Sequence, residues 1–170
     1  MKQENKFVAQ LFHYLAPFVD AERDLFICVD GAATKQHAGR SASGLLDPDV
    51  PDLWLTLCGQ STPIGIEAKI IESGRISVRQ SQLCAWRTGG KGTYRPRFWV
   101  TADRQLQEFS CWEHSTVATK LDASKSTIDN VAITLSKCKP SHYSSSIAQL
   151  ALFILCNHRA DGPVVEVPSS

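Results

Sequence analysis

The stretch that decides the fold is PDLWLTLCGQSTPIGIEAKI, residues 51–70. The sequence from 51 to 71 holds two apolar runs, 51–57 and 64–71, separated by the polar segment 58–63, which contains a glycine and a proline. Two apolar runs joined by a short polar turn indicate a β-hairpin. The stretch therefore predicts two paired strands, and the rest of the fold has to be built around them.

A pair of charged residues interrupts the second apolar run. Glu67 and Lys69 are two positions apart, so in a strand both side chains point to one face while Ala68 points to the other. Burying charges is costly unless they are paired or bound to a metal. Asp52, at the start of the first strand, can reach the same spot across the hairpin. We therefore expect Asp52, Glu67 and Lys69 to form one site.

Two carboxylates beside a lysine suit the hydrolysis of a phosphodiester. Mg²⁺ takes carboxylate oxygens together with waters and phosphate oxygens. A bound metal polarises the phosphate and lowers the pKa of a bound water. Lys69 would orient that water or help to deprotonate it, and would stabilise negative charge in the transition state. The expected cofactor is Mg²⁺, for which Mn²⁺ can substitute.

The remaining periodicity predicts an alternation of helices and strands. Helices are expected over 3–19, 77–87, 102–114 and 144–159, and strands over 25–32, 51–57, 64–71, 98–102 and 130–136. Loops are expected over 33–50 and 88–97, with an irregular connection over 115–127. A mixed central sheet flanked by helices buries these faces, so the expected class is α/β. One domain would span 1–160, followed by a flexible tail at 161–170.

The composition is that of an ordinary globular protein. The 170 residues are 43% hydrophobic and 21% charged, with a net charge of +1. This balance does not by itself indicate nucleic acid, although a local basic patch would. No apolar run approaches the roughly 18 residues of a membrane span, and the first residues do not read as a signal peptide. We therefore expect an intracellular protein that has no membrane partner and whose six cysteines are reduced.

The hairpin resembles the motif of the PD-(D/E)xK nuclease superfamily, whose fold is called restriction-endonuclease-like. Pro51-Asp52 matches the PD element, and Glu67-Ala68-Lys69 matches ExK. Over roughly residues 4–102 the chain looks similar to small virus-type replication–repair nucleases and to members that resemble Holliday-junction resolvases. One departure is Val50, which stands where the usual member has a glycine. Pro48-Asp49 is a second literal PD, set aside because it does not directly precede the apolar strand.

The resemblance implies a metal-dependent endonuclease acting on double-stranded or branched DNA. It implies that Asp52 and Glu67 hold the metal and that Lys69 positions the attacking water. Glu4, at the start of the first helix, would be an additional acid and metal ligand. Gln82 would lie beside the active site on the helix that follows the motif, with Gln80 as its rival. A homodimer or higher homo-oligomer is also implied, because two DNA strands need two active sites.

Basic side chains are expected to contact the DNA backbone, since phosphate contacts come mainly from such groups. The candidates are Lys35, His37, Arg40, Arg75, Arg79, Lys91, Arg95 and Arg97. For Lys35, His37 and Arg40 the alternative is solvated loop charge. The alternative for the Asp52, Glu67 and Lys69 set is a cross-strand salt bridge on an exposed hairpin. The alternative for Glu4 is an acid favoured by the helix dipole.

Three other functions stay open. The chain could be a site-specific endonuclease of homing or restriction type, in which 33–50 and the C-terminal half read base edges. It could be a DNA-binding module that is catalytically silent, or an unrelated protein with a chance motif. Sequence preference in cleavage separates the first from a resolvase, and absence of divalent-metal binding would favour the last.

Overall fold

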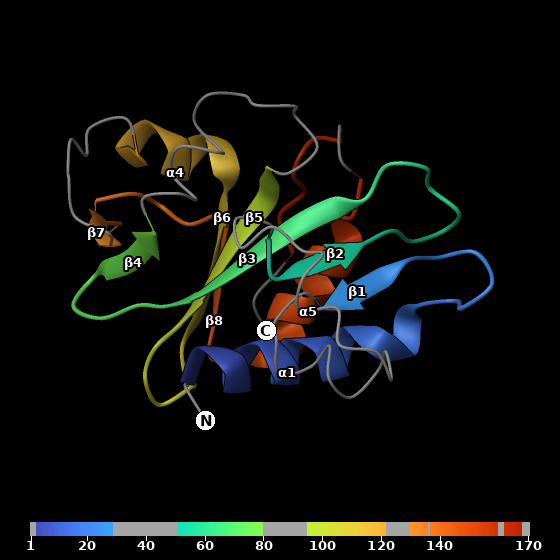
Figure 1. Cartoon of the computed structure of the whole chain (residues 1–170), viewed down its shortest axis with the longest axis horizontal. Coiled ribbons are helices and arrows are strands. Elements are labelled where there is room, and N and C mark those ends of the chain that lie inside the picture. The colour runs from blue at the N-terminus through green and yellow to red at the C-terminus, as the bar shows by residue number, and fades with distance from the viewer. Residues whose placement is uncertain are drawn as a thin grey trace.

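A six-stranded mixed sheet forms the centre of the fold (Figure 1). The computed structural model describes residues 3–28, 51–79, 95–121, 130–135, 137–159 and 162–167. Within them the strand order is β1 (Phe26–Cys28), β2 (Leu53–Leu55), β3 (Ile64–Ile70), β5 (Pro96–Ala102), β6 (Phe109–Glu113) and β8 (His142–Ser144). Strands β3 and β5 run parallel, and the other neighbouring pairs of this sheet are antiparallel. The expected α/β class with a mixed sheet is confirmed.

The hairpin expected from residues 51–71 is present. Strand β2 pairs antiparallel with β3, with Leu53 opposite Ile66 and Trp54 opposite Gly65. The turn between the strands includes Gly59, whose φ of 68° suits a residue without a side chain. The backbone N–H of Gly59 also donates to a carboxylate oxygen of Asp24 at 3.1 Å. The hairpin therefore brings the beginning of β2 next to the middle of β3.

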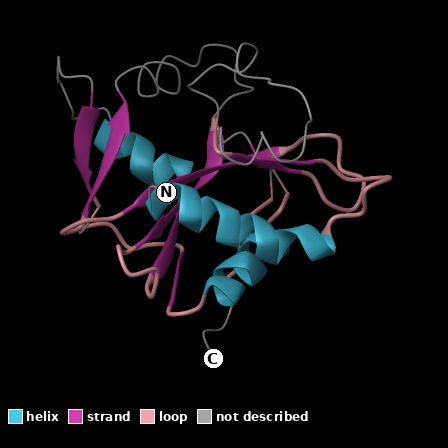
Figure 2. Cartoon of the chain, turned by 60° about the horizontal axis from the view of Figure 1, so that its bottom comes forward, coloured by secondary structure: helices cyan, strands magenta, loops and turns pink. Residues whose placement is uncertain are grey.

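Two helices cover one face of the sheet (Figure 2). They are α1 (Gln3–Leu15), which continues into the 3-10 helix η1 (Ala16–Phe18), and α5 (Ile147–Cys156). The buried residues of α1 recur at helical spacing and pack on the same face of the sheet as Ile66, Ala68, Phe98 and Val100. A fully buried Leu or Phe contributes about 1.5–3 kcal/mol. This core therefore fixes the beginning of α1 relative to β3.

The opposite face of the sheet is covered by a second, smaller layer. Strands β4 (Arg75–Arg79) and β7 (Asn130–Thr134) form a separate antiparallel pair, and α4 (His114–Leu121) lies beside them. The core under this layer consists of Ile76, Val78, Trp99, Trp112, Val117, Ile133 and Leu135. Glu67 pairs with Trp99 in the register of β3 and β5. The charged pair of β3 therefore lies on the face that this second layer covers.

The helix expected over 77–87 is wrong at its start, because residues 77–79 belong to β4. Ile76 and Val78 are buried while Ser77 is exposed, which is the two-residue period of a strand. The pairing of β4 with β7, a strand far along the chain, decides this outcome. The rest of that expected helix, with Gln80 and Gln82, lies outside the described residues.

The helix expected over 102–114 is also wrong. A turn follows β5, in which the carboxylate of Asp103 accepts the backbone N–H groups of Gln105, Gln107 and Glu108. Strand β6 then takes up Phe109–Glu113, and α4 begins at His114, where an irregular connection was expected from 115. Strand β8 was not anticipated from the sequence. The helices near the two ends and the strands near 26, 98 and 130 are confirmed.

The segment 162–167 was expected to be part of a loose tail, but in the structure it is fastened to α5. The side chain of Asn157 donates to the carbonyl oxygen of Val165 at 3.0 Å and accepts from its N–H at 2.6 Å. Val164 and Val167 pack against the core. The last described residues are therefore part of the folded unit.

The described part of the chain contains five cysteines, and none of them is in a disulfide. No helix in the described ranges is both long enough and apolar enough to cross a lipid bilayer.

Candidate active site

Strands β2 and β3 separate at the point where Asp52 and Glu67 lie. Their last paired residues are Leu53 and Ile66, and β3 continues beyond this point to Ile70. The backbone N–H of Ala68 donates instead to Oδ2 of Asp52 at 2.8 Å. A side-chain carboxylate thus occupies the place of a strand carbonyl. The proline–aspartate pair at 51–52 ends the ladder and leaves an open edge on β3.

The side chain of Lys69 lies at this edge and contacts two carboxylates, one from β3 and one from α1. Its Nζ lies 2.7 Å from Oε1 of Glu67 and 3.1 Å from Oε1 of Glu4, at the beginning of α1. Glu67 is fully buried and Lys69 is 6% exposed, whereas the Glu4 side chain is 39% exposed. Glu4, Asp52, Glu67 and Lys69 form what we call the carboxylate–lysine cluster. Its open side is the side of Glu4 and Asp52.

The cluster carries more negative than positive charge. Burial, reinforced by the charge of Glu67, raises the pKa of Asp52 well above its ordinary value of 3.8, although Lys69 and the Ala68 N–H oppose the rise. For Lys69, burial alone would lower the pKa, but Glu67, Asp52 and Glu4 together raise it above its ordinary value. Lys69 is therefore an ammonium at every physiological pH, and a further cation beside Asp52 would favour the ionised form of its carboxyl group.

The donor set of the cluster fits a hard divalent cation only in part. Carboxylate oxygens of Asp52 and Glu67 are suitable ligands for Mg²⁺, which commonly takes one or two carboxylates and completes its shell with waters and phosphate oxygens. Within the described ranges, no group of three or more His, Cys, Asp or Glu side chains is arranged as a metal site. The cluster therefore suits an ion shared with a phosphate better than an all-protein metal site.

The structure brings together the four residues that the sequence proposed for the cluster. Of the proposed DNA contacts, Arg75 and Arg95 are exposed. Arg97 instead donates to the carbonyl oxygen of Gly162 at 2.6 Å and lies over the Phe98 ring. Arg79 lies in β4. Four of the basic candidates (Lys35, His37, Arg40 and Lys91) and Gln82 lie outside the described residues.

Sequence reasoning missed Thr101, which lies beside the cluster. Thr101 on β5 is opposite Lys69 in the parallel register, so both side chains belong to the same face of the sheet. Its side chain is 1% exposed, and its hydroxyl has no hydrogen-bond partner among the described residues. The sequence held no signal for this neighbour, because the register of two distant parallel strands cannot be read from either strand alone.

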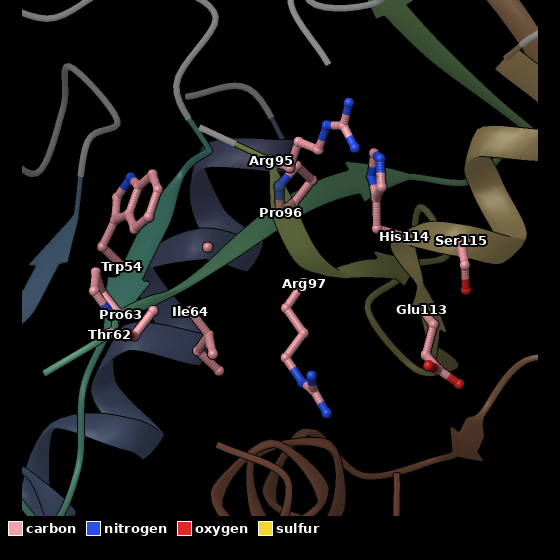
Figure 3. Close-up of a pocket in the computed structure, with 11 residues that line it drawn as sticks. Trp54, Thr62, Pro63, Ile64, Arg95, Pro96, Arg97, Glu113, His114 and Ser115 are labelled. Carbon is pink, nitrogen blue, oxygen red and sulfur yellow. The ribbon is translucent and has the colours of Figure 1, made fainter. Parts of the chain in front are cut away.

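A pocket near the cluster was also missed. It has a volume of about 500 Å³ and lies at the beginnings of β3, β5 and α4 (Figure 3). It is lined by Trp54, Thr62, Pro63, Ile64, Gly65, Arg95, Pro96, Arg97, Glu113, His114 and Ser115. The sequence signals were Arg95 and Arg97, which were expected to contact the DNA backbone but were not expected to line a pocket.

Several solved structures resemble this fold, and a resolvase and a homing endonuclease are among them. No protein-family model and no curated protein matches the sequence. The fold is similar to that of a Holliday junction resolvase from the archaeon Archaeoglobus fulgidus, with 14% identity over 77% of this chain and 86% of that chain, and a TM-score of 0.43. It is also similar to a bacterial homing endonuclease, with 16% identity over 68% of this chain and 76% of that chain, and a TM-score of 0.26. No conclusion about activity follows from likenesses of this size.

Proposed function

We propose that the chain is a metal-dependent DNA endonuclease that hydrolyses phosphodiester bonds at the carboxylate–lysine cluster. The observation that carries this proposal is the contact of Lys69 with Glu67 and Glu4 at the place where Asp52 ends the β2–β3 ladder. A structural salt bridge needs one carboxylate for one ammonium. Here three carboxylates surround a single ammonium, an excess that costs stability and that a bound cation would offset.

The metal would be Mg²⁺, or Mn²⁺ in its place, on Asp52 and Glu67, with Glu4 as a further candidate ligand. When bound, such an ion polarises the scissile phosphate and lowers the pKa of a bound water. The raised pKa of Asp52 supports this assignment, because a second positive charge near that carboxylate would relieve the repulsion from Glu67.

Lys69 would orient the attacking water and offset the charge that develops on the phosphate. Its raised pKa keeps it protonated, so it can donate hydrogen bonds but cannot accept the proton of the water. Glu67 and Glu4 hold the ammonium in place at 2.7 and 3.1 Å. Of the two roles expected for this lysine, orientation therefore fits the structure better than deprotonation.

Cleavage of plasmid and four-way-junction DNA tests the proposal. Wild type is expected to cut in Mg²⁺, whereas Glu67→Gln and Lys69→Met are expected to cut at least about 100-fold more slowly, the scale of losing one preorganised charge contact. Glu72→Gln is the matched control, because Glu72 follows β3 but is exposed and paired with Arg104. Thermal unfolding of each variant separates a loss of chemistry from a loss of fold.

The outcomes decide between the functions that remain open. Cleavage of the junction in preference to linear DNA supports a resolvase, and cleavage at one sequence supports a site-specific endonuclease of homing or restriction type. Binding of DNA without cleavage in Mg²⁺ or Mn²⁺ would leave a catalytically silent binding module. We also propose a homodimer or higher homo-oligomer, which light scattering at working concentration would test.

A further inference from the structure

The pocket shown in Figure 3 begins two residues along the hairpin from the cluster. Trp54 and Gly65 face each other across the hairpin and line the pocket. Trp54 follows Asp52 by two positions, and Gly65 precedes Glu67 by two positions. These four positions therefore share one face of the sheet. Two residues of a strand span about 6.6 Å. The pocket therefore lies next to the cluster along the hairpin.

One side of the pocket presents hydrogen-bond donors. In Figure 3 the guanidinium of Arg95 lies near the His114 ring, while Arg97 and Glu113 point away from both. The register of β3 and β5 shifts by one residue between Pro96 and Phe98, so that Gly65 pairs with Pro96 and the next pair skips Arg97. Glu113, the carboxylate in the lining, is turned away from Arg95.

The orientation of His114 is set by a tryptophan of the second core. The indole N–H of Trp99 donates to Nδ1 of His114 at 3.1 Å. An indole nitrogen can only donate, so Nδ1 is unprotonated and the neutral ring carries its hydrogen on Nε2. Burial, with the nearby charge of Arg95, lowers the pKa of His114 to about 4. At neutral pH this ring is an uncharged donor beside a charged one, and such a pair suits an anion.

We propose that this pocket binds one nucleotide of the DNA strand that is cut, with its phosphate on Arg95 and His114 and its base on Trp54. The inference rests on the proposed nuclease function. A volume of about 500 Å³ falls within the roughly 300–1,000 Å³ of small-molecule sites. Trp54 is partly exposed, and aromatic faces stack on bases without regard to sequence. Together the donors and the indole would hold the strand in register with the cluster.

The pocket can be tested without any cleavage. With ¹⁵N-labelled histidine at pH 7 and no metal, thymidine 5′-monophosphate is expected to shift the His114 Nε2 signal, and thymidine at equal concentration is not. Arg95→Ala should weaken the apparent affinity at least about 5-fold, roughly one charge-assisted hydrogen bond. Arg23→Ala is the matched control, because Arg23 is an exposed arginine paired with Asp20, away from the pocket. A signal that stays fixed with the monophosphate, or moves equally in Arg95→Ala, overturns the proposal.

A second experiment places the pocket on the substrate strand. Oligonucleotides would carry one neutral methylphosphonate, stepped along the strand, and binding would be measured with Glu67→Gln so that nothing is cut. With Arg95 present, the protein should lose affinity for the oligonucleotide when the neutral link lies close to the scissile bond but not when it lies far from it. In the Arg95→Ala background the position of the link should make no difference. If the monophosphate binds but no DNA is cut by wild type, the nuclease function fails while the nucleotide pocket stands. If DNA is cut but neither probe depends on Arg95, only the pocket fails.

Discussion

Gly65 leaves no room for a side chain against Pro51. A Cβ at position 65 would lie 2.9 Å from Cγ of Pro51 and 3.2 Å from Cα of Pro96. Pro96 belongs to the backbone of β5, which pairs with Gly65, so it cannot yield by rotating a side chain. Pro51 is also held by its ring and is followed directly by Asp52. A side chain at position 65 would therefore push on the residue that directly precedes Asp52 of the cluster.

Gly65→Ala is expected to destabilise the protein by about 1–3 kcal/mol, the cost of overpacking a filled site, and to lower cleavage per folded molecule because Asp52 is displaced. Urea unfolding and cleavage rates measure the two effects. Gly59→Ala is the control: its Cβ would meet nothing within 4 Å, but its φ of 68° makes a side chain strained. That variant should lose about 1–2 kcal/mol and keep its activity. Equal activity of both variants would show that Pro51 does not position Asp52.

Asp52→Asn is expected to stabilise the metal-free protein at neutral pH and to abolish its activity. The pKa of Asp52 is raised above 3.8 by burial and by Glu67. The stability that the neutral Asp52 side chain contributes is thus complete below pH 3.8 and is lost as pH rises through the raised pKa. The asparagine side chain avoids this loss because it does not ionise, and its amide oxygen can still accept the backbone N–H of Ala68. Urea unfolding in EDTA should show an advantage at pH 7 that shrinks toward pH 4, and a less stable variant at pH 7 would contradict it.

The stability of wild type and of Asp52→Asn can also be compared in the presence of a divalent metal. Mg²⁺ at about 100 times its Kd would stabilise wild type by about 2.7 kcal/mol through mass action alone. Asp52→Asn should show little of this gain, and Glu72→Gln should show all of it. Equal stabilisation of wild type and Asp52→Asn would place the ion elsewhere.

Thr101→Val is expected to leave stability unchanged or to raise it. The Thr101 hydroxyl is buried and has no hydrogen-bond partner among the described residues. Removing an unsatisfied polar group from such a place relieves its desolvation cost, about 1–3 kcal/mol at most. Thermal unfolding checks this, with Thr101→Ser as the variant that keeps the hydroxyl. If valine lowers stability by more than about 1 kcal/mol while serine does not, the hydroxyl has a hydrogen-bond partner, and a bound water would be one that fits.

His114 is expected to stay neutral until about pH 4. Its lowered pKa means that the folded state resists protonation, so its contribution to stability is present above the ordinary value of 6.5 and is lost as pH falls toward 4. Histidine ring ¹⁵N shifts recorded against pH measure this directly and should report the Nε2–H tautomer. Trp99→Phe, which removes the indole donor, should loosen that tautomer preference. A titration midpoint near 6.5 in wild type would mean that the ring is neither buried nor close to Arg95.

The hairpin and the three cluster residues that it carries could be predicted from the sequence because both are local. Alternation placed Glu67 and Lys69 on one face, and a short turn placed Asp52 beside them. The position of Glu4 at the beginning of the first helix was also readable. Its distance of 3.1 Å from Lys69 was not, since it depends on how α1 packs across the sheet.

The features that sequence reasoning missed depend on distant pairing. Strand β4 was interpreted as a helix because its short alternating stretch needs β7 to become a strand. Strand β6 was interpreted as a helix because the turn held by Asp103 has no distinctive local pattern. The pocket combines β2, β3, β5 and α4, and no window of sequence contains them together. Local sequence patterns thus placed the charged residues of the hairpin, whereas long-range packing determined the strands and the pocket around them.

The parallel pairing of β3 with β5 also bears on the order in which the chain folds. A hairpin such as β2–β3 closes within about 1–10 μs, whereas pairing across a long crossover is slow because the loop must be closed first. We expect Glu67 and Lys69 to stay hydrated until β5 pairs with β3. The free-energy cost of desolvating this ion pair then falls on the later folding steps. We therefore expect the charges proposed for the chemistry to slow the final closure of the sheet.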